Sequence, residues 1–222
     1  MEKITEDVSQ ILTETKVTHW LDSGTLLGAY RFGSHMPYDD DVDFGVMKSD
    51  FDNHHSEIER QLSEKGYRLS RNIDDIYQVH NIRNPNLAHL DFFLFEPFPA
   101  KKNHLRLSSQ TWHDRAEHAG YGAGFPQNII FHADGSLQKI NLLGKDYPAP
   151  VDLVAYFKRW YREPDILTNF MITNTHVGSG VCSRRVLIQD IRKDPVSLSK
   201  MFTHLEKVYE GRFKRSDSKL AQ

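Results

Sequence analysis

Residues 37–47 read PYDDDVDFGVM, an acidic run that passes into an alternating polar and apolar segment. Alternation with a period of two is typical of a β-strand that has one buried face, so we expect a strand over 41–47. Side chains two residues apart point to the same face, roughly 6.6 Å apart along the strand. Asp41 and Asp43 therefore share one face. The opposite face, which we expect to pack into the core, carries Val42, Phe44 and Val46.

Two carboxylates on one strand face repel each other unless a cation lies between them. Oxygen ligands of this kind suit Mg²⁺ or Mn²⁺. The acidic run could instead be a solvated turn. That alternative explains less well than a metal-binding strand why the carboxylates alternate with apolar residues. A calcium loop of the EF-hand type is excluded, because its sixth position would be Phe44 instead of glycine and its twelfth Asp50 instead of glutamate.

A third carboxylate lies in the apolar segment HLDFFLF, residues 89–95. Burying Asp91 in such a strand costs free energy unless it is paired or binds a metal. An arginine or a backbone amide would also satisfy it. Beside Asp41 and Asp43, we interpret Asp91 as a third metal ligand.

Residues 20–28 read WLDSGTLLG and lead from an expected strand into an expected helix through a turn of small residues. Amide groups at a helix N-terminus can hold a phosphate, and the Thr25 hydroxyl can add a donor. An ordinary helix cap at Ser23 or Thr25 is the alternative. Arg31 follows this helix and could clamp a diphosphate through two hydrogen bonds, or simply lie at the surface.

The order of expected elements gives a mixed α/β chain. We expect helices at 2–16, 25–30, 50–65, 152–161 and 198–215. Strands are expected at 17–21, 41–47 and 87–95, with a strand pair over 67–83. A hairpin over 129–143 would turn at Asp134-Gly135.

The composition excludes several classes of protein. The chain has 222 residues and a formal net charge of -2, so no overall attraction to nucleic acid is indicated. From Arg184 onward ten Lys/Arg face five Asp/Glu, which we interpret as a solvated basic helix face. A nucleic-acid binder is therefore not favoured. The twelve histidines are expected in surface or core positions instead of a zinc site.

Cellular location is constrained by two further features. Cys182 is the single cysteine, which excludes an internal disulfide and a multi-cysteine zinc site. The N-terminus has no signal-peptide core, and no apolar run reaches the ~20 residues that a membrane span needs. We expect a cytoplasmic protein without a transmembrane segment.

The stretch WLDSGTLLGAYRFGSHMPYDDDVDFGV, residues 20–46, resembles the signature of the LicD family, which includes fukutin and fukutin-related protein. The resemblance extends through LDFFLF at 90–95 and, more faintly, through YPAPVDLVAYFKRWY at 147–161. A glycine-aspartate ending expected after the last segment is absent, because Arg162 and Glu163 follow Tyr161.

This resemblance implies a nucleotidyltransferase core related to DNA polymerase β, in which helices flank a mixed sheet, followed by a mixed or helical C-terminal extension. Residues 1–97 would form the catalytic core. Residues 98–222 would complete the same domain on the acceptor side and end in the basic helix.

The resemblance also implies an activity, the transfer of a phospho-alcohol such as phosphocholine or ribitol phosphate. The donor would be CDP-linked and the acceptor a glycan hydroxyl. Asp41 and Asp43 match the family's metal-binding pair and Asp91 its third acidic position, with Mg²⁺ or Mn²⁺ as cofactor. Gly24 and Thr25, beside Ser23, match the phosphate-binding turn.

Two other functions use the same residues. One is nucleotidyl transfer, which moves NMP from an NTP to a small molecule, a protein or RNA. The other is a catalytically inactive module that binds a nucleotide. The donor alcohol, the number of metal ions and the oligomeric state are left open by the sequence.

Overall fold

The computed structural model describes residues 1–36, 41–72, 74–84, 88–110 and 124–160, together with the backbone of two strands at 170–175 and 182–187. The chain divides into two compact units, Met1–Arg162 and Glu163–Gln222. Tyr38, Asp39, Asp40 and the helix expected at 198–215 lie outside the described residues. Among the described residues, no helix combines the length and the apolar character needed to cross a membrane.

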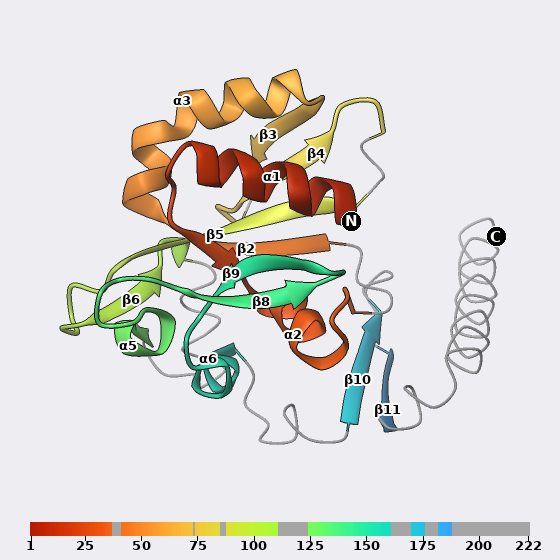
Figure 1. The fold of residues 1–222 in the computed structure, drawn as a ribbon, viewed down its shortest axis with the longest axis vertical. Coiled ribbons are helices and arrows are strands. Elements are labelled where there is room, and N and C mark those ends of the chain that lie inside the picture. The colour runs from red at the N-terminus through yellow and green to blue at the C-terminus, as the bar shows by residue number, and fades with distance from the viewer. Residues whose placement is uncertain are drawn as a thin grey trace, which may run out of the picture. The chain divides into compact units, whose positions relative to one another are not determined.

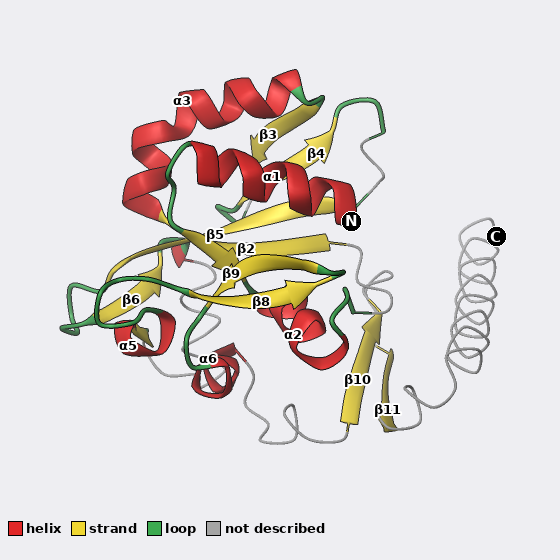
Figure 2. Ribbon diagram, in the orientation of Figure 1, coloured by secondary structure: helices red, strands yellow, loops and turns green. Residues whose placement is uncertain are grey.

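A mixed sheet forms the centre of the first unit, with strand order β1-β2-β5-β4-β3 (Figure 2). β2 and β5 run parallel, and the other neighbours in this order are antiparallel. The far end of β5 pairs with β6, which pairs with β7. The strands are β1 (His19–Leu21), β2 (Asp41–Met47), β3 (Tyr67–Arg71), β4 (Tyr77–Asn81), β5 (His89–Pro97), β6 (His104–Leu107) and β7 (Phe125–Pro126).

Helices α1 (Glu2–Glu14) and α3 (Lys48–Glu64) lie beside each other over the central strands (Figure 1). The face of β2 that was expected to pack into the core is buried there. Its side chains Val42, Phe44 and Val46 are all fully buried. Phe51 of α3 packs its ring 5.6 Å from that of Phe92 on β5. The predicted alternation of β2 is therefore confirmed on its apolar side.

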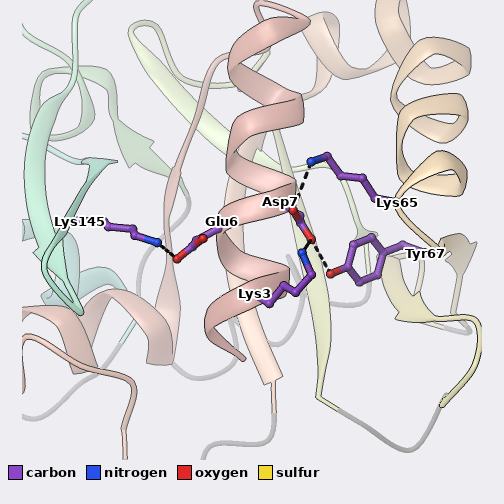
Figure 3. A network of polar contacts seen from close by, with 6 residues as sticks. All are labelled: Lys3, Glu6, Asp7, Lys65, Tyr67 and Lys145. Carbon is purple, nitrogen blue, oxygen red and sulfur yellow. Dashed lines mark hydrogen bonds and ion pairs between the residues drawn. The ribbon is translucent and has the colours of Figure 1, made fainter.

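Asp7 of α1 ties this helix to α3 and β3 (Figure 3). Its carboxylate accepts hydrogen bonds from Lys3 at 2.8 Å, Lys65 at 3.2 Å and the Tyr67 hydroxyl at 2.8 Å. Burial alone would raise the pKa of Asp7, but these three donors together lower it below its ordinary value. A second ion pair, Glu6 with Lys145, joins α1 to β9 (Lys145–Ala149).

Helix α2 (Ser23–Phe32) packs against β2 and β8 (Gln138–Leu142). It is longer than the helix expected at 25–30. Asp22 is the N-cap in place of Ser23 or Thr25, and its side chain accepts a hydrogen bond from the Ser23 amide at 2.6 Å. Arg31 lies within the last turn of the helix and not in a loop.

The prediction of a hairpin over 129–143 is wrong. Ile129 and Ile130 belong to the short helix α5 (Gln127–Ile130) and are buried. The hairpin lies further on, where β8 pairs with β9 and turns at Leu143-Gly144. Both turn residues have positive φ, 55° and 83°, which suits a two-residue hairpin turn.

Helix α6 (Leu153–Trp160) follows the hairpin, close to the helix expected at 152–161. The first unit therefore continues past residue 97. The expected division between a catalytic core at 1–97 and an acceptor side at 98–222 stays a prediction. In the second unit, β10 (Phe170–Thr175) pairs antiparallel with β11 (Cys182–Leu187).

Candidate metal centre

The register between β2 and β5 brings polar side chains together. Asp41 pairs with His89, and Asp43 pairs with Asp91. Paired residues on neighbouring strands point to the same face, so all four side chains project from one side of the sheet. Asp41, His89 and Asp91 each offer one ligand atom, and these atoms lie within 4.8 Å of one another.

These residues fit a divalent cation. Two ligands on one ion, with bonds of about 2.1 Å, lie roughly 3 to 4.2 Å apart, and the three donor atoms lie within 4.8 Å of one another. The set contains two carboxylates and one imidazole, which is a donor set for divalent metal ions. All three residues are partly buried.

His89 was not among the predicted ligands, which were Asp41, Asp43 and Asp91. Its Nε2 atom lies 3.5 Å from Oδ1 of Asp91. One signal in the sequence pointed to it, because His89 precedes Asp91 by two residues in the same strand and so shares its face. The pairing of His89 with Asp41 depends on the strand register.

Asp43 lies one row further along the same face and is 6% exposed. Its Oδ2 atom accepts a hydrogen bond from the Gly24 amide at 3.1 Å. Its own amide donates to the Thr25 hydroxyl at 2.9 Å. Within the described chain, Asp43 is not part of the cluster that Asp41, His89 and Asp91 form. Its side chain and amide bind the start of α2 to β2.

The first turn of α2 is thus built around Asp43. Ser23 has a φ of 43°, a conformation that an L-residue adopts at a cost. The Gly24 amide and the Thr25 hydroxyl, which were expected to hold a phosphate, contact Asp43. Arg31 is 7% exposed and lies about 12 Å from Ser23 along the helix axis.

A buried hydrogen-bond chain links this turn to α6. The Trp20 indole donates to the Tyr156 hydroxyl at 2.9 Å, and that hydroxyl donates to Oδ1 of Asp22 at 2.9 Å. Asp22 is completely buried, and this burial raises its pKa to about 7, although the hydrogen bonds from Ser23 and Tyr156 act in the opposite direction.

Trp20 is a core residue. It is fully buried, and its ring lies 5.0 Å from that of Phe95. A Cβ atom at Gly45 would lie 2.3 Å from this indole, so the absent side chain at Gly45 makes room for it. Its complete burial leaves no face of the Trp20 ring on which a ligand could stack.

Strand β4 supports the cluster from the side opposite β2. Gln78 donates a hydrogen bond to Oδ1 of Asp91 at 2.9 Å. The His80 ring stacks on that of His89, with centroids 5.5 Å apart and an interplanar angle of 21°. Two of the three candidate ligands are therefore held by contacts from the neighbouring strand.

Comparison with known proteins finds a family match over most of the first unit. The sequence model described as "LicD/FKTN/FKRP, nucleotidyltransferase domain" matches residues 16–152. An uncharacterized protein of Rickettsia typhi is 35% identical over 103 residues, which are 46% of this chain and 31% of that protein. Ribitol 5-phosphate transferase FKRP of Mus musculus is 29% identical over 125 residues, which are 54% of this chain and 24% of that protein.

The chain thus spans less than a third of the length of these two relatives. Among solved structures, the lincomycin-bound lincosamide antibiotic adenylyltransferase LnuA shares 14% identity at a TM-score of 0.41. That match covers 69% of this chain and 84% of the other.

Proposed function

Because the chain belongs to the LicD/FKTN/FKRP family of nucleotidyltransferase domains, we propose that it transfers a phospho-alcohol from a CDP-linked donor to a glycan hydroxyl. The observation that carries the proposal is the cluster of Asp41, His89 and Asp91, which lies within the matched segment. The choice of a phospho-alcohol over a nucleotide rests on the similarity to the mouse relative, a ribitol 5-phosphate transferase. We propose that the reaction takes place on a polymerase β-like core.

In the proposed reaction, the acceptor hydroxyl attacks the phosphorus that carries the alcohol. A new phosphorus–oxygen bond forms while the bond to CMP breaks, and CMP leaves with the electron pair. A bound Mg²⁺ or Mn²⁺ would offset the charge of the donor diphosphate. Asp41 and Asp91 would hold this ion, with Asp43 as the second carboxylate of β2. The alternative role for Asp91 is to accept the proton of the hydroxyl instead of completing the metal site.

The α2 turn would position the donor. Ser23, Gly24 and Thr25 are proposed to lie against the diphosphate, because their turn is bound directly to Asp43. The predicted diphosphate contact of Arg31 requires its side chain to reach back from the far end of α2. Residues 1–97 would supply the donor chemistry and residues 98–222 the acceptor side.

Product analysis tests the reaction class. The full chain is incubated with CDP-ribitol or CDP-choline, Mg²⁺ or Mn²⁺ and a set of glycan acceptors, and the products are identified by mass spectrometry. Free CMP together with a phospho-alcohol on the acceptor supports the proposal. Release of pyrophosphate from an NTP would replace it with nucleotidyl transfer.

The control for this assay is Asp41→Asn, which keeps the shape of the side chain but removes its charge. Release of CMP by this variant at the wild-type rate would show that the activity does not come from the cluster. Metal-dependent binding of CDP without turnover on any acceptor would favour the catalytically inactive module.

A further inference from the structure

We propose that His89 is a nitrogen ligand of this centre, and that the mixed donor set makes it select Mn²⁺ over Mg²⁺. The proposal rests on the proposed function only in placing a divalent ion at the cluster, and it does not depend on which group is transferred.

The position of His89 is fixed by the sheet and not by a loop. β5 pairs with β2 on one side and β4 on the other, and His89 is the register partner of Asp41. Asp91, two residues further along β5, projects from the same face. The three donor atoms therefore converge because of backbone pairing, which holds the side chains close to one another before any ion binds.

A simple ion pair between His89 and Asp91 explains the geometry less well. Their closest atoms are 3.5 Å apart, which is longer than a normal hydrogen bond. The Asp91 oxygen in that pair already accepts a hydrogen bond from Gln78 at 2.9 Å. A gap of this size between two donor atoms is what a shared metal ion would bridge.

The contacts from β4 have the character of a supporting shell around metal ligands. Gln78 orients the carboxylate of Asp91, and the His80 ring limits the orientation of the His89 ring by stacking on it. Such outer contacts fix ligand orientation in metal sites, and their loss commonly weakens metal binding by 10- to 100-fold.

Selectivity follows from ligand chemistry. Mg²⁺ strongly prefers oxygen ligands in an octahedral arrangement and gives up its water reluctantly. An imidazole nitrogen suits first-row transition ions better, and Mn²⁺ accepts both carboxylate and imidazole ligands. A centre of Asp41, His89 and Asp91 should therefore discriminate against Mg²⁺ more strongly than a centre made only of carboxylates.

The direct test uses the full chain and Mn²⁺ alone. Pulsed electron paramagnetic resonance on the Mn²⁺ complex should show coupling to a ¹⁴N nucleus, replaced by ¹⁵N coupling when the protein is labelled with ¹⁵N-histidine. Absence of nitrogen coupling in the wild-type complex overturns the proposal. This readout needs neither donor nor acceptor, so it is independent of the proposed transfer reaction.

Substitutions identify the histidine and test selectivity. His89→Asp replaces nitrogen by oxygen at the same position, and it should abolish the coupling and lower the ratio of Mn²⁺ to Mg²⁺ affinity by about tenfold. His132→Ala removes an exposed imidazole outside the cluster and should change neither quantity. An unchanged affinity ratio in His89→Asp, with the coupling retained, would place the nitrogen ligand elsewhere.

A misfolded variant would lose metal binding whatever the role of His89. The far-ultraviolet circular dichroism spectrum of each variant must therefore match that of the wild type before affinities are compared. Mn²⁺ binding with nitrogen coupling but without transfer would leave this inference intact and count against the proposed function. The opposite result is a wild-type protein that shows no nitrogen coupling and transfers the group equally well with Mg²⁺. That result would overturn this inference and leave the proposed function intact.

Discussion

Asp41 and Asp91 differ from Asp43 in what surrounds them. Asp43 is engaged by the start of α2, whereas Asp41 and Asp91 have ligand atoms that converge with that of His89. The predicted metal-binding pair, Asp41 and Asp43, is thus divided between two settings, and Asp91 shares the setting of Asp41. Asp43 contacts the first turn of α2, and Asp41 and Asp91 face the proposed cation position.

Replacing Asp41 or Asp91 by Asn should separate activity from stability. Turnover should fall about 100-fold or more, because charge stabilisation at the reacting phosphorus is lost. The free energy of unfolding without metal should stay the same or rise slightly, since a repulsive charge is removed. Steady-state kinetics and urea denaturation measure the two effects.

Asp146→Asn is the matched control, because Asp146 is an exposed carboxylate on β9. It should alter neither turnover nor stability. Wild-type turnover in both Asp41→Asn and Asp91→Asn would remove these residues from the reaction.

Among the elements, α6 is joined to the β1–α2 turn by buried polar contacts as well as by packing. Tyr156 supplies both links, since its hydroxyl accepts from Trp20 and donates to Asp22. Tyr156→Phe should therefore leave the buried Trp20 indole without its acceptor and Asp22 with one hydrogen bond fewer, while the bond from the Ser23 amide to Asp22 remains. We expect a loss of about 2 kcal/mol in the free energy of unfolding, measured by chemical denaturation.

Tyr147→Phe is the control for this change. Tyr147 is also buried, at 6% exposure, but no hydrogen bond of its hydroxyl is found within the described residues. It should cost well under half as much. Equal costs for the two substitutions would show that the chain through Tyr156 adds no stability.

The contacts of α1 with α3 and β3 predict a pH dependence centred on Asp7 (Figure 3). The folded state lowers the pKa of Asp7, so the carboxylate form is favoured there. This contribution is present above the unfolded pKa of about 4 and is lost as pH falls through the folded pKa. Asp7→Asn should therefore cost about 1–2 kcal/mol at pH 7 and progressively less below pH 4.

Denaturation by urea from pH 3 to pH 7 measures the difference between wild type and Asp7→Asn. Asp52→Asn is the control, because its ion pair with Lys48 lies on the surface of α3 and should contribute less than about 1 kcal/mol. A cost for Asp7→Asn that stays constant over this pH range would contradict the assignment.

For the whole molecule, metal binding should appear as added stability. An ion that binds only the folded state at 100 times its dissociation constant adds about 2.7 kcal/mol. For a unit of this size, that raises the melting temperature by about 5–10 °C. Calorimetry with Mn²⁺ should show the increase, EDTA should abolish it, and Asp41→Asn should not respond. An identical response in Asp41→Asn would place the ion elsewhere.

The sequence by itself determined the features that depend on neighbouring residues. Alternation over 41–47 is a property of the extended backbone, so it predicted β2 and the separation of its two faces. Caps and turns were predicted less well. Asp22 caps α2 because its side chain reaches the Ser23 amide, and the Asp134-Gly135 turn is followed by residues that pair with β9 instead of an earlier strand.

Only the tertiary structure decided which side chains meet across the sheet. His89 lies beside Asp41 because β2 and β5 pair in one register, although almost fifty residues separate them in the chain. The pairing of Gly24 and Thr25 with Asp43, and of Tyr156 with Asp22, depends on the same kind of long-range packing. Local patterns fix the direction of a side chain within its own strand or helix, whereas its partner is fixed by register and packing between elements distant in sequence.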